Sequence, residues 1–112
     1  MKNAEIVQAL NGIVSVINNQ ATLIKMDPLS KRLPVKVSFA IHKNKQTLTD
    51  VYKPYLDTLN ALDKNSATYQ EEIRELLDTD VDVELKRVSE DDFKDYDPAL
   101  SELEALSFML EE

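Results

Sequence analysis

The side chains most able to do chemistry in this chain are a run of carboxylates. They occupy every second position, as in the ligand run of a calcium loop: Asp78, Asp80, Asp82 and Glu84. A calcium loop also needs a turn glycine and a terminal glutamate at a fixed distance, and both are missing here. Val81 and Val83 instead alternate with the acids, as in a strand. We therefore interpret the carboxylates as the solvated face of a strand.

The single histidine, His42, is the other candidate, because an imidazole can act as a general base or bind a metal. It lies beside an apolar stripe, with no serine or cysteine in a recognisable nucleophile motif. The chain has no cysteine, so a transition-metal site would depend almost wholly on carboxylates. Its only glycine, Gly12, lies in a helical pattern, which excludes glycine-rich phosphate loops. We expect no catalytic residues, no cofactor and no metal site, and a protein that is not an enzyme.

The net charge of −8 is unevenly distributed along the chain. Residues 1–69 hold nine basic residues and five acids, whereas residues 70–112 hold four basic residues and sixteen acids. The acidic balance of the whole chain argues against nucleic acid as a partner. The asymmetry favours electrostatic pairing, within one chain or between copies. A solvated surface that only keeps the protein soluble is the alternative.

The strongest pattern is a row of large apolar residues at intervals of seven, here called the seven-residue row: Ile41, Leu48, Tyr55, Leu62, Tyr69 and Leu76. A second row falls four residues after each member. This spacing predicts a long helix with a coiled-coil-like seam, which is a surface for packing and partners. We expect the seam to be strongest between Leu48 and Leu62. The predicted interaction residues are Ile41, Leu48, Tyr52, Tyr55, Leu59, Leu62, Tyr69, Ile73 and Leu76.

The elements that carry these residues form a mainly α (α+β) fold, which we predict to be a single domain over residues 1–112. Apolar residues at helical spacing predict an N-terminal helix over residues 4–19, with Asn3 as its N-cap. Gly12 costs that helix about 1 kcal/mol, so we expect it to mark a close crossing with another helix. A connection over residues 20–33 follows.

A long central helix is predicted over residues 34–78. Pro54 removes one of its hydrogen bonds, at a cost of about 3 kcal/mol. Because the seven-residue row keeps its phase across this proline, we expect a kinked but continuous helix. The alternative is a turn over residues 63–66 that splits off a further helix beginning near Ala67.

The C-terminal third is predicted to hold one strand and one helix. Apolar and charged residues alternate over residues 80–88, which is typical of a half-buried β-strand. Its partner would be the extreme N-terminus, residues 21–26, or the same strand of a second copy. Asp97 as N-cap opens a last helix over residues 98–111.

Four stretches of the chain resemble a family of small uncharacterised proteins of tailed, siphovirus-type phages and prophages of Gram-positive bacteria. They are Asn3–Val7, Leu33–Ile41, Val83–Val88 and Leu103–Glu112. The resemblance implies a phage setting and a helix–strand–helix layout. It brings no assigned activity and no catalytic residues.

We therefore expect a non-enzymatic phage protein that acts through protein–protein interaction as an assembly or accessory factor, with a homodimer as the first choice of oligomer. The alternative is a phage-encoded acidic inhibitor of a host defence or DNA-binding protein, acting through the acidic C-terminal third. No apolar run reaches the roughly 18 residues of a membrane span, and the N-terminus lacks the apolar core of a signal peptide. We expect no membrane partner, and a location in the host bacterial cytoplasm or on the virion.

Overall fold

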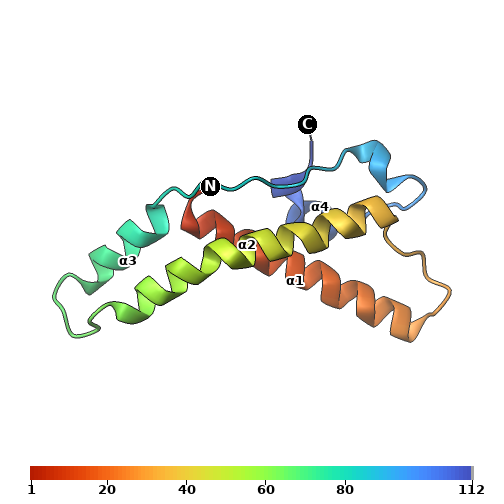
Figure 1. Ribbon diagram of the computed structural model, residues 1–112. Coiled ribbons are helices and arrows are strands. Elements are labelled where there is room, and N and C mark those ends of the chain that lie inside the picture. The colour runs from red at the N-terminus through yellow and green to blue at the C-terminus, as the bar shows by residue number, and fades with distance from the viewer. Residues whose placement is uncertain (112) are drawn as a thin grey trace.

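Two long helices that cross each other form the frame of the molecule in this computed structural model, which describes residues 1–111 (Figure 1). Helix α1 spans Asn3–Met26 and helix α2 spans Val35–Ala61. A shorter helix, α3, spans Tyr69–Asp78 and contacts both of them. The principal extents are 54 × 30 × 22 Å, so the molecule is elongated along the two long helices. The mainly helical prediction is confirmed.

Helix α1 is longer than predicted, because it continues through residues 20–26 instead of ending at residue 19. No glycine or proline interrupts that stretch. The helix ends at Met26, and its C-cap, Asp27, is the residue before Pro28. Asn3 is not the N-cap. It is buried within the first turn, and its side-chain Nδ2 donates a hydrogen bond of 2.8 Å to the carbonyl oxygen of Leu76 at the end of α3. This bond ties the start of α1 to α3.

Helix α2 runs without interruption through Pro54, as the phase of the apolar row predicted. The single helix predicted to residue 78 is wrong, because α2 ends at Ala61. The Asp63 side chain accepts a hydrogen bond of 2.9 Å from the Asn65 amide, and the Asp63 carbonyl accepts one of 3.0 Å from the Ser66 amide. These turn bonds compete with helical ones, so the chain splits where the alternative interpretation placed the turn.

Residues 79–89, here called the extended segment, replace the predicted strand over residues 80–88. Among residues 1–111 no strand forms, and the segment makes one isolated bridge at each end. Asp80 pairs antiparallel with the N-terminus, and Val88 pairs parallel with Leu110. Each partner covers a single residue pair before it leaves as a helix or turn, and a ladder therefore cannot propagate. The N-terminus was one of the predicted partners.

The middle of the extended segment is held by one side chain of α2. Asn44 is 1% exposed, and its amide pairs with the Lys86 backbone in both directions. Its Nδ2 donates to the Lys86 carbonyl at 2.8 Å, while its Oδ1 accepts from the Lys86 amide at 2.7 Å. A side-chain amide thus supplies the two hydrogen bonds that a neighbouring strand would have supplied.

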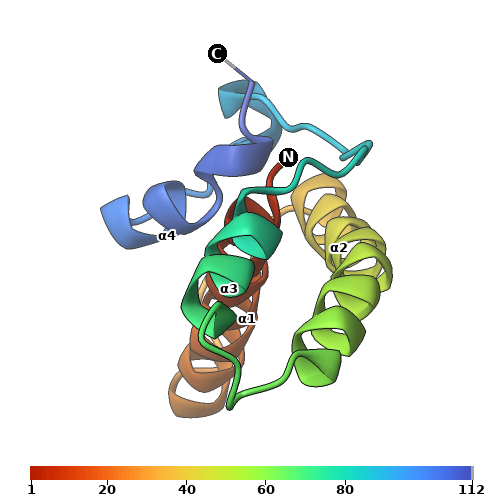
Figure 2. The ribbon, with the colours of Figure 1, turned by 90° about the vertical axis from the view of Figure 1, so that its left-hand side faces the viewer.

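The C-terminal helix is shorter than the prediction over residues 98–111. A 3₁₀ turn, η1 (Glu90–Phe93), is followed by α4 (Leu100–Ala105) and by a second 3₁₀ turn, η2 (Ser107–Met109). The helix gives way to η2 because the chain beyond it returns to Val88, whose amide donates to the Met109 carbonyl at 3.0 Å. Figure 2 shows α4 and α2 on opposite sides of α1.

Gly12 lies where α4 packs on α1. A Cβ added there would be 2.5 Å from the Ala105 carbonyl oxygen, and only glycine allows that approach. The predicted close crossing at Gly12 is confirmed.

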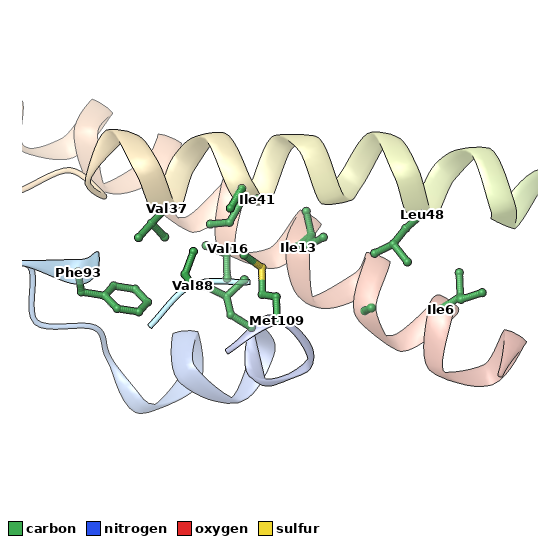
Figure 3. Packing of buried hydrophobic residues seen from close by; sticks show 12 residues of the cluster. Ile6, Ile13, Val16, Val37, Ile41, Leu48, Val88, Phe93 and Met109 are labelled. Atoms are coloured by element: carbon green, nitrogen blue, oxygen red, sulfur yellow. The ribbon is translucent and has the colours of Figure 1, made fainter. Parts of the chain in front are cut away.

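The hydrophobic core lies at the crossing of α1 and α2 and is closed by the extended segment and the C-terminal turns (Figure 3). Its buried members are Ile6, Ala9, Ile13, Val16, Val37, Ala40, Ile41, Leu48, Val88, Phe93, Leu106 and Met109. The core therefore draws on α1, α2, the extended segment and the C-terminal turns, whereas α3 has no fully buried residue.

Candidate protein-interaction surface

The predicted seam is divided between the interior of the chain and its flank. Ile41 and Leu48 are 2% and 0% exposed and pack in the core, so they are not available to a partner. The remaining members are half-buried on the second half of α2, at the residue that follows it and on α3: Tyr52, Tyr55, Leu59, Leu62, Tyr69, Ile73 and Leu76. Because α3 folds back onto α1 and α2, much of the row closes on its own chain.

Exposed large apolar side chains instead gather where α1 ends and α2 begins. We call residues 23–39 the hairpin end. It carries five of the eight such side chains found among residues 1–111, and the other three are scattered. The five are Leu23 at 49%, Met26 at 79%, Leu29 at 93%, Val35 at 86% and Phe39 at 59% exposed. Exposed apolar side chains concentrated in one patch of the surface mark an interaction site in soluble proteins.

Beside this patch, a groove opens between the second half of α1 and the first half of α2. Its volume is about 540 Å³, which is within the range of ligand and side-chain pockets. Its lining is mainly apolar, with Gln20, Arg32, Ser38 and His42 as its polar members. The apolar lining residues are Val16, Ile17, Ala21, Ile24, Leu33, Val35, Phe39 and Ile41.

The surroundings of the groove are basic. Residues 20–45 contain six lysines and arginines against one acid, Asp27. Two of these lysines are bound by the C-terminal third: Lys36 forms an ion pair of 2.9 Å with Asp92, and Lys31 donates to the Asp95 carbonyl at 3.2 Å. The hydrogen bond between Lys36 and Asp92 lowers the pKa of Asp92 and raises that of Lys36. One lysine of the basic part thus pairs with a carboxylate of the C-terminal third within the same chain.

A polar cluster joins α4 to the wall of the groove. Tyr96 donates through its hydroxyl to the Glu102 carboxylate at 2.8 Å, and Gln20 Nε2 donates to that hydroxyl at 2.6 Å. Glu102 is 8% exposed and also accepts from the Ala99 amide at 3.1 Å. Burial, and then the Glu102 carboxylate, raise the pKa of Tyr96 to about 12. The cluster is fully hydrogen-bonded, as a structural tie would be.

The remaining candidate groups do not converge on a reaction site. His42 is exposed at the rim of the groove. Of the alternating carboxylates, Asp80, Asp82 and Glu84 are exposed and Asp78 pairs with Lys2 at 2.6 Å. Over residues 1–111 no three side chains of the metal-binding types lie close enough to hold an ion. In the same residues, no helix is sufficiently long and apolar to cross a membrane.

Sequence reasoning did not find the groove, although part of its signal was present. Val35 and Phe39 are four residues apart and therefore share a face of α2, but that face lies away from the seven-residue row. Leu23 and Met26 fall in a stretch that was interpreted as a connection. The sequence feature that would have identified this end of the molecule is a second apolar face next to a basic cluster.

Comparison with known proteins does not classify the chain: no family model, no curated protein and no solved structure matches it. Fold and surface together describe a helical protein with an apolar, basic-rimmed groove at one end of two crossed helices.

Proposed function

We propose that this chain is a non-enzymatic phage protein that acts by binding another protein, as an assembly or accessory factor. The observation that supports this function is the concentration of exposed apolar side chains at the hairpin end, next to an open groove. Leaving that much apolar surface in water is unfavourable, and covering it with a partner recovers about 25 cal/mol for each Å² buried. The phage setting is supported by the sequence resemblance alone.

The hairpin end is a better candidate for the interface than the seven-residue row. Ile41 and Leu48, which would have anchored a seam between two copies, are enclosed within the chain. The rest of the row is half-buried, whereas Met26, Leu29 and Val35 are almost fully exposed. Homodimerisation through the row would therefore add little new apolar burial.

Affinity capture with the full chain tests this function. The bait would be exposed to a lysate of phage-producing Gram-positive cells, and bound proteins identified by mass spectrometry. We expect the wild-type chain to retain a phage-encoded protein that Phe39→Glu loses. Leu100→Glu is the matched control, because Leu100 is also exposed, at 71%, but lies on α4. Identical captures by all three chains would refute the proposal.

The acidic inhibitor is a second candidate, favoured by the exposure of Glu90, Asp91 and Asp95. Asp92 is not part of that surface, since Lys36 holds it. Reversal of the three exposed charges to lysine should abolish capture of a host defence or DNA-binding protein, and Phe39→Glu should leave that capture intact. The opposite pattern of losses favours the hairpin end.

A further inference from the structure

The crossing of α1 and α2 creates two open sectors, and the chain itself fills one of them. Figure 1 shows α3 in the sector between the start of α1 and the end of α2. Its half-buried residues, Tyr69, Glu72, Ile73, Leu76 and Leu77, lie on one helical face, and its other face is exposed and charged. In the sector between the start of α1 and the end of α2, the two long helices thus pack against an amphipathic helix.

The groove occupies the opposite sector. Its apolar lining comes from the same two helices, beyond the other side of the crossing, and the loop over residues 27–34 joins them at its far end. The lining residues of α1 extend from Val16 to Ile24, which is about 12 Å of helix rise. Two to three turns of a bound helix would cover that length.

The positive charge around the groove favours an occupant with acidic side chains. Arg32 lines the groove, and Lys25 follows the lining residue Ile24 on α1. Both are exposed and form no ion pair within residues 1–111. A helix with acidic residues beside its apolar face would pair with them, as electrostatic complementarity at an interface requires. Helix α3 has this composition, with Glu71, Glu75 and Asp78 exposed.

The same charges oppose a symmetric dimer through this face. Two-fold symmetry brings the same patch of each copy together, so the basic rim of one copy would meet the basic rim of the other. Like charges placed against each other across an interface cost several kcal/mol. A basic helix is disfavoured for the same reason.

We infer that the groove is a docking site for an acidic amphipathic helix of a different protein. The helix would present apolar side chains at positions i, i+4 and i+7 to Ile17, Ile24 and Phe39, in the helix-in-groove mode of recognition. Its acidic residues would face Lys25 and Arg32. This inference rests on the proposed function and names the class of partner.

Selection of displayed peptides against the full chain tests the inference without knowledge of the natural partner. The probe is a library of helix-forming peptides in which both the apolar and the charged positions vary. We expect the enriched peptides to be amphipathic and net acidic, and to bind more weakly as salt is raised. Enrichment of basic peptides, or of peptides without an apolar face, would overturn the inference.

Substitutions then locate the bound peptide by fluorescence anisotropy. Phe39→Glu should weaken binding by about tenfold or more, as expected for an apolar anchor. Ala21 is exposed in the lining, so Ala21→Glu and Ala21→Lys add similar bulk with opposite charge. Ala21→Glu should weaken an acidic peptide more than Ala21→Lys does, and Leu100→Glu should leave its affinity unchanged. Equal effects of the two Ala21 substitutions would refute an acidic occupant.

Two outcomes separate this inference from the proposed function. Capture from the lysate could require Phe39 while binding of the selected peptides is unaffected by Phe39→Glu. The hairpin end would then bind a protein, but its occupant would not be an acidic helix. If light scattering finds a dimer that Phe39→Glu dissociates, the occupant is a second copy. Either result overturns this inference and leaves the proposed function standing. If Phe39→Glu does not change capture from the lysate, the proposed function itself is overturned.

Discussion

Removal of the Asn44 side chain should loosen the whole C-terminal third. Asn44→Ala deletes both hydrogen bonds to the Lys86 backbone, of 2.8 and 2.7 Å, in a partly buried site. A typical hydrogen bond contributes about 0.5–1.5 kcal/mol net, so the loss should be about 1–3 kcal/mol. For a domain of this size, 1 kcal/mol lowers the melting temperature by about 4 °C. We therefore expect a decrease of about 4–12 °C in thermal unfolding followed by circular dichroism.

Alanine is also a better helix former than asparagine, which would partly mask the loss. Asn18→Ala, at an exposed position within α1, measures that gain alone and is the matched control. Hydrogen exchange supplies a local measurement, since the Lys86 amide loses its acceptor in Asn44→Ala and should exchange faster. Unfolding temperatures that match for the two variants, together with unchanged exchange at Lys86, would show that Asn44 does not hold the extended segment.

Three further outcomes test other contacts. Gly12→Ala should lower the free energy of unfolding by about 1–2 kcal/mol in urea, because its Cβ would meet a carbonyl oxygen of α4 at 2.5 Å, whereas Ser15→Ala on the exposed face should not. Lys36 lowers the pKa of Asp92 below 3.8, so the stability advantage over Asp92→Asn should be present above that pH and vanish as the pH falls through the lowered pKa. Tyr96 has a pKa of about 12 against an ordinary value of 10.0, so it should contribute a fall in stability between these pH values. Tyr96→Phe should remove that contribution and the tyrosinate absorbance change near pH 12.

The helical content was predictable because local signals decided it. Apolar spacing, Pro28 and the unbroken phase across Pro54 define most of α1 and α2. The same phase misled beyond Ala61, since a row with a period of seven also continues across a short turn whose length preserves the spacing. There the polar turn over residues 63–66 was the better guide, because its side chains bond their own backbone.

The extended segment shows what periodicity cannot decide. Its alternation correctly predicted that Val81, Val83 and Leu85 face inward, since they pack against the core. A strand, however, also needs a continuous backbone partner. Residues 79–89 find three short ones instead: the N-terminus, the amide of Asn44 and the chain end near Met109. All three are distant in sequence from the extended segment, so no local pattern predicts them.

The candidate site was missed because exposure at the hairpin end is set by the course of the helices past their crossing. Val16, near the crossing, is 2% exposed, whereas Leu23, two turns later on the same helix, is 49% exposed. Both are β-branched or aliphatic residues that a helical pattern assigns to a core. Because the helices diverge on both sides of the crossing, each side needs a third element to cover its apolar residues. The chain supplies α3 for one side only, and the exposed apolar residues on the other side therefore favour a helix that comes from another protein.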